Sequence, residues 1–260
     1  MCKENFKLSF EQYFSDENSL SVIEANDSRL TTEENEKHIG PSFVDDIRRD
    51  LSSNDTVFYK KNNVSIVNGC LCIKATNEDN VYYGAQAFLK EKKFGNGYLE
   101  VKAKLPKAIP SVTPKISLKG EKPNCLFCID FAQVLGIKGK NECAMNSAFL
   151  TEGKYKKMQM IYSNNNTWPT LYPPFGSEEL LSEDWHTFGF EKDEEFAVFY
   201  VDGNEYCKID LDNPVFMVFK GETMLDFSVS VGLRETEAAD ENTILPCEML
   251  IEYVKFYERG

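Results

Sequence analysis

Gly97-Tyr98-Leu99-Glu100-Val101-Lys102-Ala103-Lys104-Leu105 decides the fold class of this chain. From Tyr98 onward, polar and apolar side chains take alternate positions. This period of two is typical of a β-strand with one buried face. In an antiparallel sandwich the other face meets solvent or lines a cleft. The stretch therefore predicts a strand of a two-layered β-sandwich, with its core face formed by Leu99, Val101, Ala103 and Leu105.

The chain on both sides of this strand shows short β-rich runs with turn residues between them. These runs are residues 57–60, 64–67, 70–75, 82–89, 115–118, 126–131, 147–150, 157–162, 186–191, 196–201, 204–210, 217–219, 225–231 and 248–257. Asn68-Gly69 and Asp202-Gly203 predict tight hairpins, because both pairs adopt positive φ at low cost. Pro114 and its neighbouring prolines interrupt the middle section. Many short strands and few helical segments predict an all-β jelly-roll sandwich.

The first fifth of the chain is different, being polar and acidic with weak periodicity. We expect an edge strand over residues 7–14, a loop with a short helix over 15–40, and a helix over 43–51. The predicted organisation is an irregular N-terminal segment, 1–55, that belongs to the same domain as the sandwich of 56–260.

The charge and cysteine content limit the classes of partner. A formal net charge of -13 over 260 residues disfavours nucleic acid and anionic membranes. No apolar run approaches the roughly 18 residues of a membrane helix. Eight cysteines permit disulfides without fixing their pairing. Cys125-x-x-Cys128 has no second pair to complete a zinc site, and the chain has only two histidines, so no metal or cofactor is expected.

Two observations on the compartment point in opposite directions. Asn-x-Ser/Thr sequons occur at Asn26, Asn54, Asn63 and Asn165, as in secreted proteins. Residues 1–14 contain no apolar segment of the kind found in secretory signals. We expect an extracellular protein on the first observation. The sequence leaves disulfide connectivity and oligomeric state open.

Four segments, in this order, resemble glycoside hydrolase family 16, the laminarinase-like endo-β-1,3-glucanases with a concanavalin A-like jelly roll. Residues 97–106 (GYLEVKAKLP) resemble the family's YGRVEVRAKLP strand, and 248–257 (EMLIEYVKFY) resemble its EMLVDYVRVY strand. Residues 184–191 (DWHTFGFE), with FYVDG at 199–203, resemble DFHTYxxEW and FYVDG. Between them, residues 128–133 (CIDFAQ) stand where the family has EIDIME.

A subgroup resemblance lies near the start of the sandwich. Residues 56–59 (TVFY) and 68–74 (NGCLCIK) resemble the opening of the glucanase-like domains of invertebrate β-1,3-glucan recognition proteins, also called Gram-negative bacteria-binding proteins. Members of that subgroup often bind glucan without cutting it. This resemblance implies a polysaccharide partner and a role in pathogen recognition.

The family resemblance assigns roles to the strand at 128–133. Retaining glycoside hydrolysis needs two carboxyl groups about 5–5.5 Å apart, and the family places them at the first and sixth positions of the motif. Strict alternation would put these positions on opposite faces, so a β-bulge at Ala132 is expected to turn the sixth side chain back. Cys128 then stands at the nucleophile position, Asp130 at the orienting aspartate, and Gln133 at the acid/base position.

Neither end of this motif retains a carboxyl group. Gln133 has no carboxyl proton for a leaving oxygen, and Cys128 is shorter than glutamate, so the resemblance predicts an inactive homologue. Two alternatives remain open. A flanking carboxylate, Glu121 or Glu142, restores the chemistry, or residues 128–133 are only a core strand.

The expected ligand contacts have changed as well. The family's tryptophans that stack on glucose align with Thr113 and Ser117, which removes their apolar contact. Candidate substrate-binding residues are Tyr83, Tyr98 and Glu100 on the concave face, and Trp168 and Tyr172 in a proline-rich loop.

The sequence thus predicts a non-catalytic glucanase-like protein that binds β-1,3-glucan or a related polysaccharide. One alternative is a structural or protein-interaction role without sugar. The other is an active endo-β-1,3-glucanase with an atypical site. Which polysaccharide is bound does not follow from the sequence.

Overall fold

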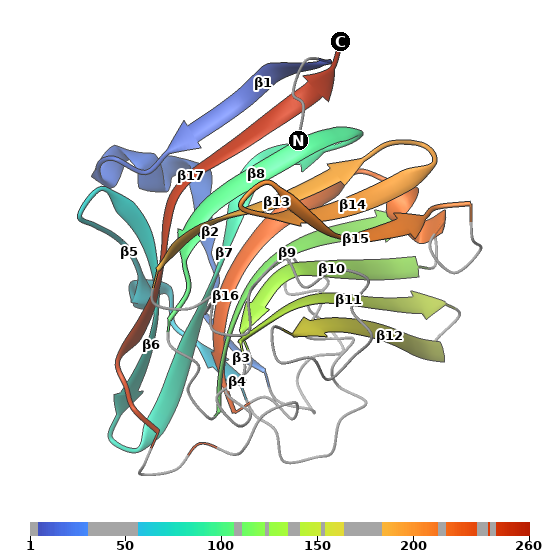
Figure 1. Ribbon diagram of the computed structural model, residues 1–260. Helices are drawn as coiled ribbons and strands as arrows, with labels where there is room; N and C mark the ends of the chain where they lie inside the picture. Colours follow the sequence, from blue (N-terminus) through green and yellow to red (C-terminus); the bar gives the residue numbers. More distant parts are fainter. Residues whose placement is uncertain are drawn as a thin grey trace.

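A computed structural model of the chain consists almost entirely of β-strands (Figure 1). It describes residues 5–30, 57–106, 111–122, 125–134, 141–151, 154–163, 184–212, 217–232, 239 and 243–260. Within these residues no helix has the length and apolar character needed to cross a bilayer. The helix expected over 43–51 lies outside them, while the short helix expected within 15–40 is the 3-10 turn η1 (Glu17–Val22).

The strands form two antiparallel sheets. Sheet A contains β1 (Phe6–Tyr13), β5 (Val64–Val67), β6 (Cys70–Glu78), β8 (Gly97–Lys104), β13 (Trp185–Lys192), β14 (Phe196–Val201), β15 (Asn204–Asp210) and β17 (Cys247–Arg259). Sheet B contains β2 (Ile23–Ala25), β7 (Val81–Phe94), β9 (Val112–Lys122), β10 (Cys125–Val134), β11 (Asn141–Thr151), β12 (Lys154–Ser163) and β16 (Thr223–Val231). Two short strands, β3 (Ser28–Leu30) and β4 (Val57–Tyr59), and two further 3-10 turns, η3 (Lys61–Asn63) and η5 (Met217–Lys220), complete the described elements.

The hydrophobic core fills the space between the sheets. Leu99, Val101 and Ala103 of β8 enter it from sheet A, as the alternation predicted. Ile129 of β10 enters it from sheet B. The rings of Phe131 on β10 and Phe190 on β13 lie 6.2 Å apart and join the two layers directly. The all-β sandwich is therefore confirmed, and each sheet has one core face and one outward face.

Both predicted hairpin turns have the backbone that their sequence demands. Asn68 and Gly69 have φ of 52° and 76°, and Asp202 and Gly203 have φ of 49° and 76°. The second turn is also tied to the neighbouring strand β13, because an Asp202 carboxylate oxygen accepts a hydrogen bond from the Thr187 amide at 2.8 Å.

The N-terminal edge strand is present, one residue earlier than expected. β1 pairs with β17, so the blue and red ends of the ribbon run side by side in Figure 1. β9 is longer than the predicted run of 115–118, because Pro114 does not interrupt it. Pro114 lies where β9 pairs with β16 but precedes the pairing with β10, a position at a strand edge that tolerates proline.

Candidate functional site

A β-bulge shapes the strand that carries the candidate site. Between Asp130 and Ala132, β10 has one more residue than its partner β9. Ala132 consequently belongs to the core, although simple alternation from Asp130 would turn it outward. Gln133 then lies opposite Lys115, whose ammonium group reaches Asp130. A bulge is present as predicted, but the extra residue relative to β9 is Phe131 and not Ala132, because Asp130 lies opposite Ser117 and Ala132 opposite Ile116. Gln133 consequently shares the outward face of sheet B with Asp130.

Asp130 is held in place by three neighbours. Its carboxylate accepts hydrogen bonds from Lys115 Nζ at 3.1 Å, from Ser117 Oγ at 2.6 Å and from Cys128 Sγ at 3.2 Å. The side chains of Lys115 and Asp130 are only 2% and 3% exposed. A buried charge is costly unless it is paired and hydrogen-bonded, and here both conditions are met.

A second buried ion pair lies beside the first on the same face. Lys119 of β9 contacts Asp226 of β16 at 3.1 Å, with both side chains almost fully buried. Asp226 is the direct neighbour of Ser117 in the ladder, and Lys119 is the neighbour of Cys128. We call this set the polar layer: Lys115, Ser117, Lys119, Cys128, Asp130, Gln133 and Asp226.

The environment of Cys128 suppresses its reactivity. Burial raises the pKa of this thiol well above its ordinary value, and the negative charge of Asp130 raises it further. The positive charges of Lys119 and Lys115 oppose these effects without cancelling them. Because the thiolate is the nucleophilic form, Cys128 is a neutral, weakly reactive thiol near pH 7.

Cys128 is therefore expected to resist alkylation in the folded protein. Treatment with iodoacetamide at pH 8, followed by peptide mass mapping, should leave Cys128 unmodified under conditions that label it fully in denaturant. The reason is its 2% exposure together with its raised pKa. Rapid modification of Cys128 in the native state would contradict the closed site.

The other candidate residues do not join Cys128. Tyr98 and Glu100 lie on β8 of sheet A and alternate with the core residues of that strand. Their side chains consequently project from the outward face of sheet A, and the hydrophobic core lies between them and the polar layer. The substrate contact predicted for Tyr98 and Glu100 stays a prediction, and these residues belong to a different sheet from Cys128. The sequence did not reveal this separation, because alternation defines the faces of a strand but not the sheet to which it belongs.

The remaining predicted contacts are dispersed. Tyr83 is half-buried, with its ring 5.9 Å from that of Phe58 and Lys60 Nζ 5.0 Å from its centroid. Trp168 and Tyr172 lie outside the described residues. No cluster of acidic, histidine or cysteine side chains suited to a metal occurs in the described part of the chain.

Sequence comparison finds a distant similarity to a glucanase. No protein-family profile matches the sequence. A β-glucanase of Acetivibrio thermocellus is 25% identical over 214 residues, which make up 80% of this chain and 58% of that protein. The chain thus spans little more than half of that curated relative.

Similar solved structures cover nearly the whole chain. The laminarinase catalytic domain of Thermotoga maritima superposes with a TM-score of 0.71 at 22% identity, over 99% of this chain and 100% of that one. The endo-β-1,3-glucanase of Pyrococcus furiosus superposes with a TM-score of 0.70 at 20% identity, over 98% of this chain and 95% of that one. A family 16 endo-glucanase of Bacteroides ovatus superposes with a TM-score of 0.68 at 15% identity, over 95% of this chain and 99% of that one. The chain has the glycoside hydrolase family 16 fold.

Within this family 16 fold, the positions that the sequence resemblance assigned to catalysis are closed. Cys128 and Gln133 are 2% and 0% exposed. Thr113 and Ser117, at the positions aligned with the stacking tryptophans, are also buried. Register places Glu142 of β11 opposite Gln133, while the side chain of Glu142 lies outside the described set.

Sequence reasoning missed the two lysines of the polar layer. Polar residues recur at every second position of β9, where Lys115, Ser117 and Lys119 alternate with the core residues Ile116 and Leu118. That alternation was a readable signal for one polar face. Asp226 could not be found this way, since its contact with Lys119 depends on the register between β9 and β16.

Proposed function

We propose that this chain is a non-catalytic protein of the family 16 fold that binds β-1,3-glucan or a related polysaccharide. The observation that carries the proposal is the buried pair of Lys115 and Asp130, flanked by Cys128 and Gln133 where a retaining enzyme needs two carboxyl groups. Asp130 is engaged by internal partners, and Gln133 delivers no proton. The proposal includes an extracellular setting and a role in pathogen recognition.

The loss of chemistry follows from what each residue lacks. General acid catalysis contributes about 10²–10⁴-fold to such reactions, and an amide at position 133 supplies none of it. A neutral, buried Cys128 does not replace a carboxylate nucleophile. The choice of ligand is supported by the glucanases that share this fold, whereas burial of the polar layer argues against sugar contacting Cys128 or Gln133.

One incubation tests both parts of the proposal. Purified protein mixed with insoluble β-1,3-glucan should be retained on the polysaccharide and should release no reducing sugar above a protein-free blank. An active endo-β-1,3-glucanase in a parallel tube checks the assay. Sugar release that disappears in Glu142→Gln would instead establish an enzyme with an atypical acid, and absence of retention would favour a structural or protein-interaction role.

A further inference from the structure

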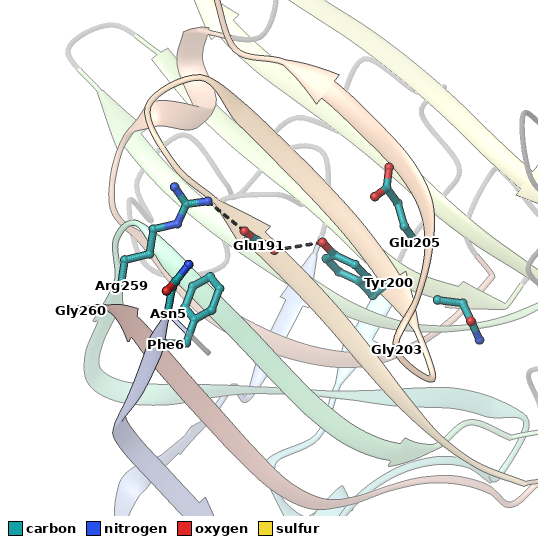
Figure 2. Close-up of a pocket in the computed structure, with 9 residues that line it drawn as sticks. Asn5, Phe6, Glu191, Tyr200, Gly203, Glu205, Arg259 and Gly260 are labelled. Carbon is teal, nitrogen blue, oxygen red and sulfur yellow. Dashed lines mark hydrogen bonds and ion pairs between the residues drawn. The ribbon is translucent and has the colours of Figure 1, made fainter. Parts of the chain in front are cut away.

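An open pocket lies on the outward face of sheet A, on the side of the sandwich away from the polar layer. Its volume is about 790 Å³, within the range of small-molecule sites. Figure 2 shows it between the end of β17 and the β14–β15 hairpin. Its lining includes Asn5, Phe6, Glu191, Tyr200, Glu205 and Arg259.

The centre of this pocket is a fixed arrangement of donors and acceptors. The Glu191 carboxylate accepts hydrogen bonds from Arg259 Nη2 at 3.0 Å and from the Tyr200 hydroxyl at 2.9 Å (Figure 2). Arg259 Nη2 also contacts Asp193 at 3.0 Å. The Arg259 side chain remains 51% exposed, so its other N–H groups are available at the surface.

Aromatic rings support the pocket from below. Tyr98 is buried, with its ring 5.7 Å from that of Tyr200 and 6.3 Å from that of Phe6. Gly189 provides the space for this ring, since a Cβ atom there would come within 2.6 Å of the Tyr98 hydroxyl. The floor is therefore closely packed, and a ligand would meet groups that are already held by their neighbours.

The charges of the pocket restrict the class of ligand. Glu191 and Glu205 carry two negative charges and Arg259 one positive charge, so an anion would meet net repulsion. Glu191 is already paired with Arg259, so its charge is largely compensated. What remains is a set of neighbouring acceptors and donors, with the Asn5 amide supplying both kinds. Neighbouring hydroxyl groups, which donate and accept together, match this set.

We infer that this pocket is a binding site for a neutral saccharide chain, remote from the degenerate strand. The choice of β-1,3-glucan as the first polysaccharide to test rests on the proposed function. It also accounts for Tyr98, which the sequence singled out and which supports the pocket instead of lining the opposite face. A polysaccharide bound here would leave the closed polar layer undisturbed.

The test compares Arg259→Met with Lys255→Met on a panel of immobilised polysaccharides. Both changes remove one positive charge from β17, but Lys255 lies against Tyr13 and Tyr253 outside the pocket. The panel contains β-1,3-glucan, xylan, mannan and anionic polygalacturonate. We expect the parent and Lys255→Met to bind one neutral polysaccharide equally, and Arg259→Met to bind it about tenfold or more weakly. Tyr200→Phe serves as a second variant that removes only the hydroxyl donor to Glu191 and should also weaken binding.

The outcomes separate this inference from the proposed function. Retention on β-1,3-glucan that neither Arg259→Met nor Tyr200→Phe reduces would overturn the pocket and leave glucan binding intact. Arg259-dependent retention on xylan or mannan alone would support the pocket and refute the choice of glucan. Binding of polygalacturonate, or of no polysaccharide by the parent, would overturn the pocket. Circular dichroism of each variant establishes that it is folded.

Discussion

Asp130→Asn is expected to lower the free energy of unfolding by about 3–5 kcal/mol, because it leaves the Lys115 ammonium buried without a counter-charge. The amide keeps the size of the carboxylate, so the loss reports charge and not volume. The substitution also replaces the charged acceptor of the hydrogen bonds that Ser117 and Cys128 donate to Asp130 with a neutral amide. The measurement is equilibrium unfolding in urea, monitored by tryptophan fluorescence.

A matched control lies on the other sheet. Lys102 and Glu252 form an ion pair at 2.7 Å, but their side chains are 33% and 37% exposed. Glu252→Gln should therefore cost no more than about 1 kcal/mol. The double variant Lys115→Met with Asp130→Leu should recover most of the stability lost in Asp130→Asn, since it removes both charges together. Equal effects of Asp130→Asn and Glu252→Gln would show that the buried pair does not have the assigned role.

The parts of the fold that could be predicted depend on short-range patterns. Alternation along 97–105 identified a strand and its core face, and the two glycine-containing turns identified their hairpins. The bulge within 128–133 followed from the family resemblance, which requires the sixth motif position to return to the face of the first, although the extra residue is Phe131 and not Ala132. These features are encoded within a few residues, so no knowledge of distant partners was needed.

The features that could not be predicted depend on register and on the layering of the sheets. A polar residue at every second position reads as solvent-facing, yet Lys115 and Lys119 are buried because Asp130 and Asp226 reach them from neighbouring strands. The sheet that Tyr98 joins was not predicted, because a single strand does not reveal which sheet it belongs to. The motif residues Cys128, Asp130 and Gln133 thus lie together on one strand, as predicted, while their closed, ion-paired state was not foreseen.

Restoring both carboxyl groups with Cys128→Glu and Gln133→Glu is expected to yield no glucanase activity and a strongly destabilised fold. Both positions are buried, and the new carboxylates would lie beside Asp130 on the same face. Lys115 and Lys119 already neutralise Asp130 and Asp226, so two added negative charges would have no matching cations in the polar layer. We expect a loss of more than about 3 kcal/mol near pH 7.

The pH dependence of this double variant distinguishes buried charge from simple overpacking. Burial and like charge raise the pKa of the introduced carboxyls above the values of the unfolded chain. The folded state then binds more protons than the unfolded state around pH 5–7, so its stability relative to the parent rises as the pH falls. Overpacking would give a loss independent of pH.

Cys128→Leu with Gln133→Leu is the control, because it adds volume without charge and should show that flat profile. Urea unfolding of parent, variant and control at pH 5 and pH 7.5 measures the difference. A double variant that is as stable as the parent and releases sugar from laminarin would mean that the site opens, and the closed polar layer would then no longer support the proposed absence of catalysis.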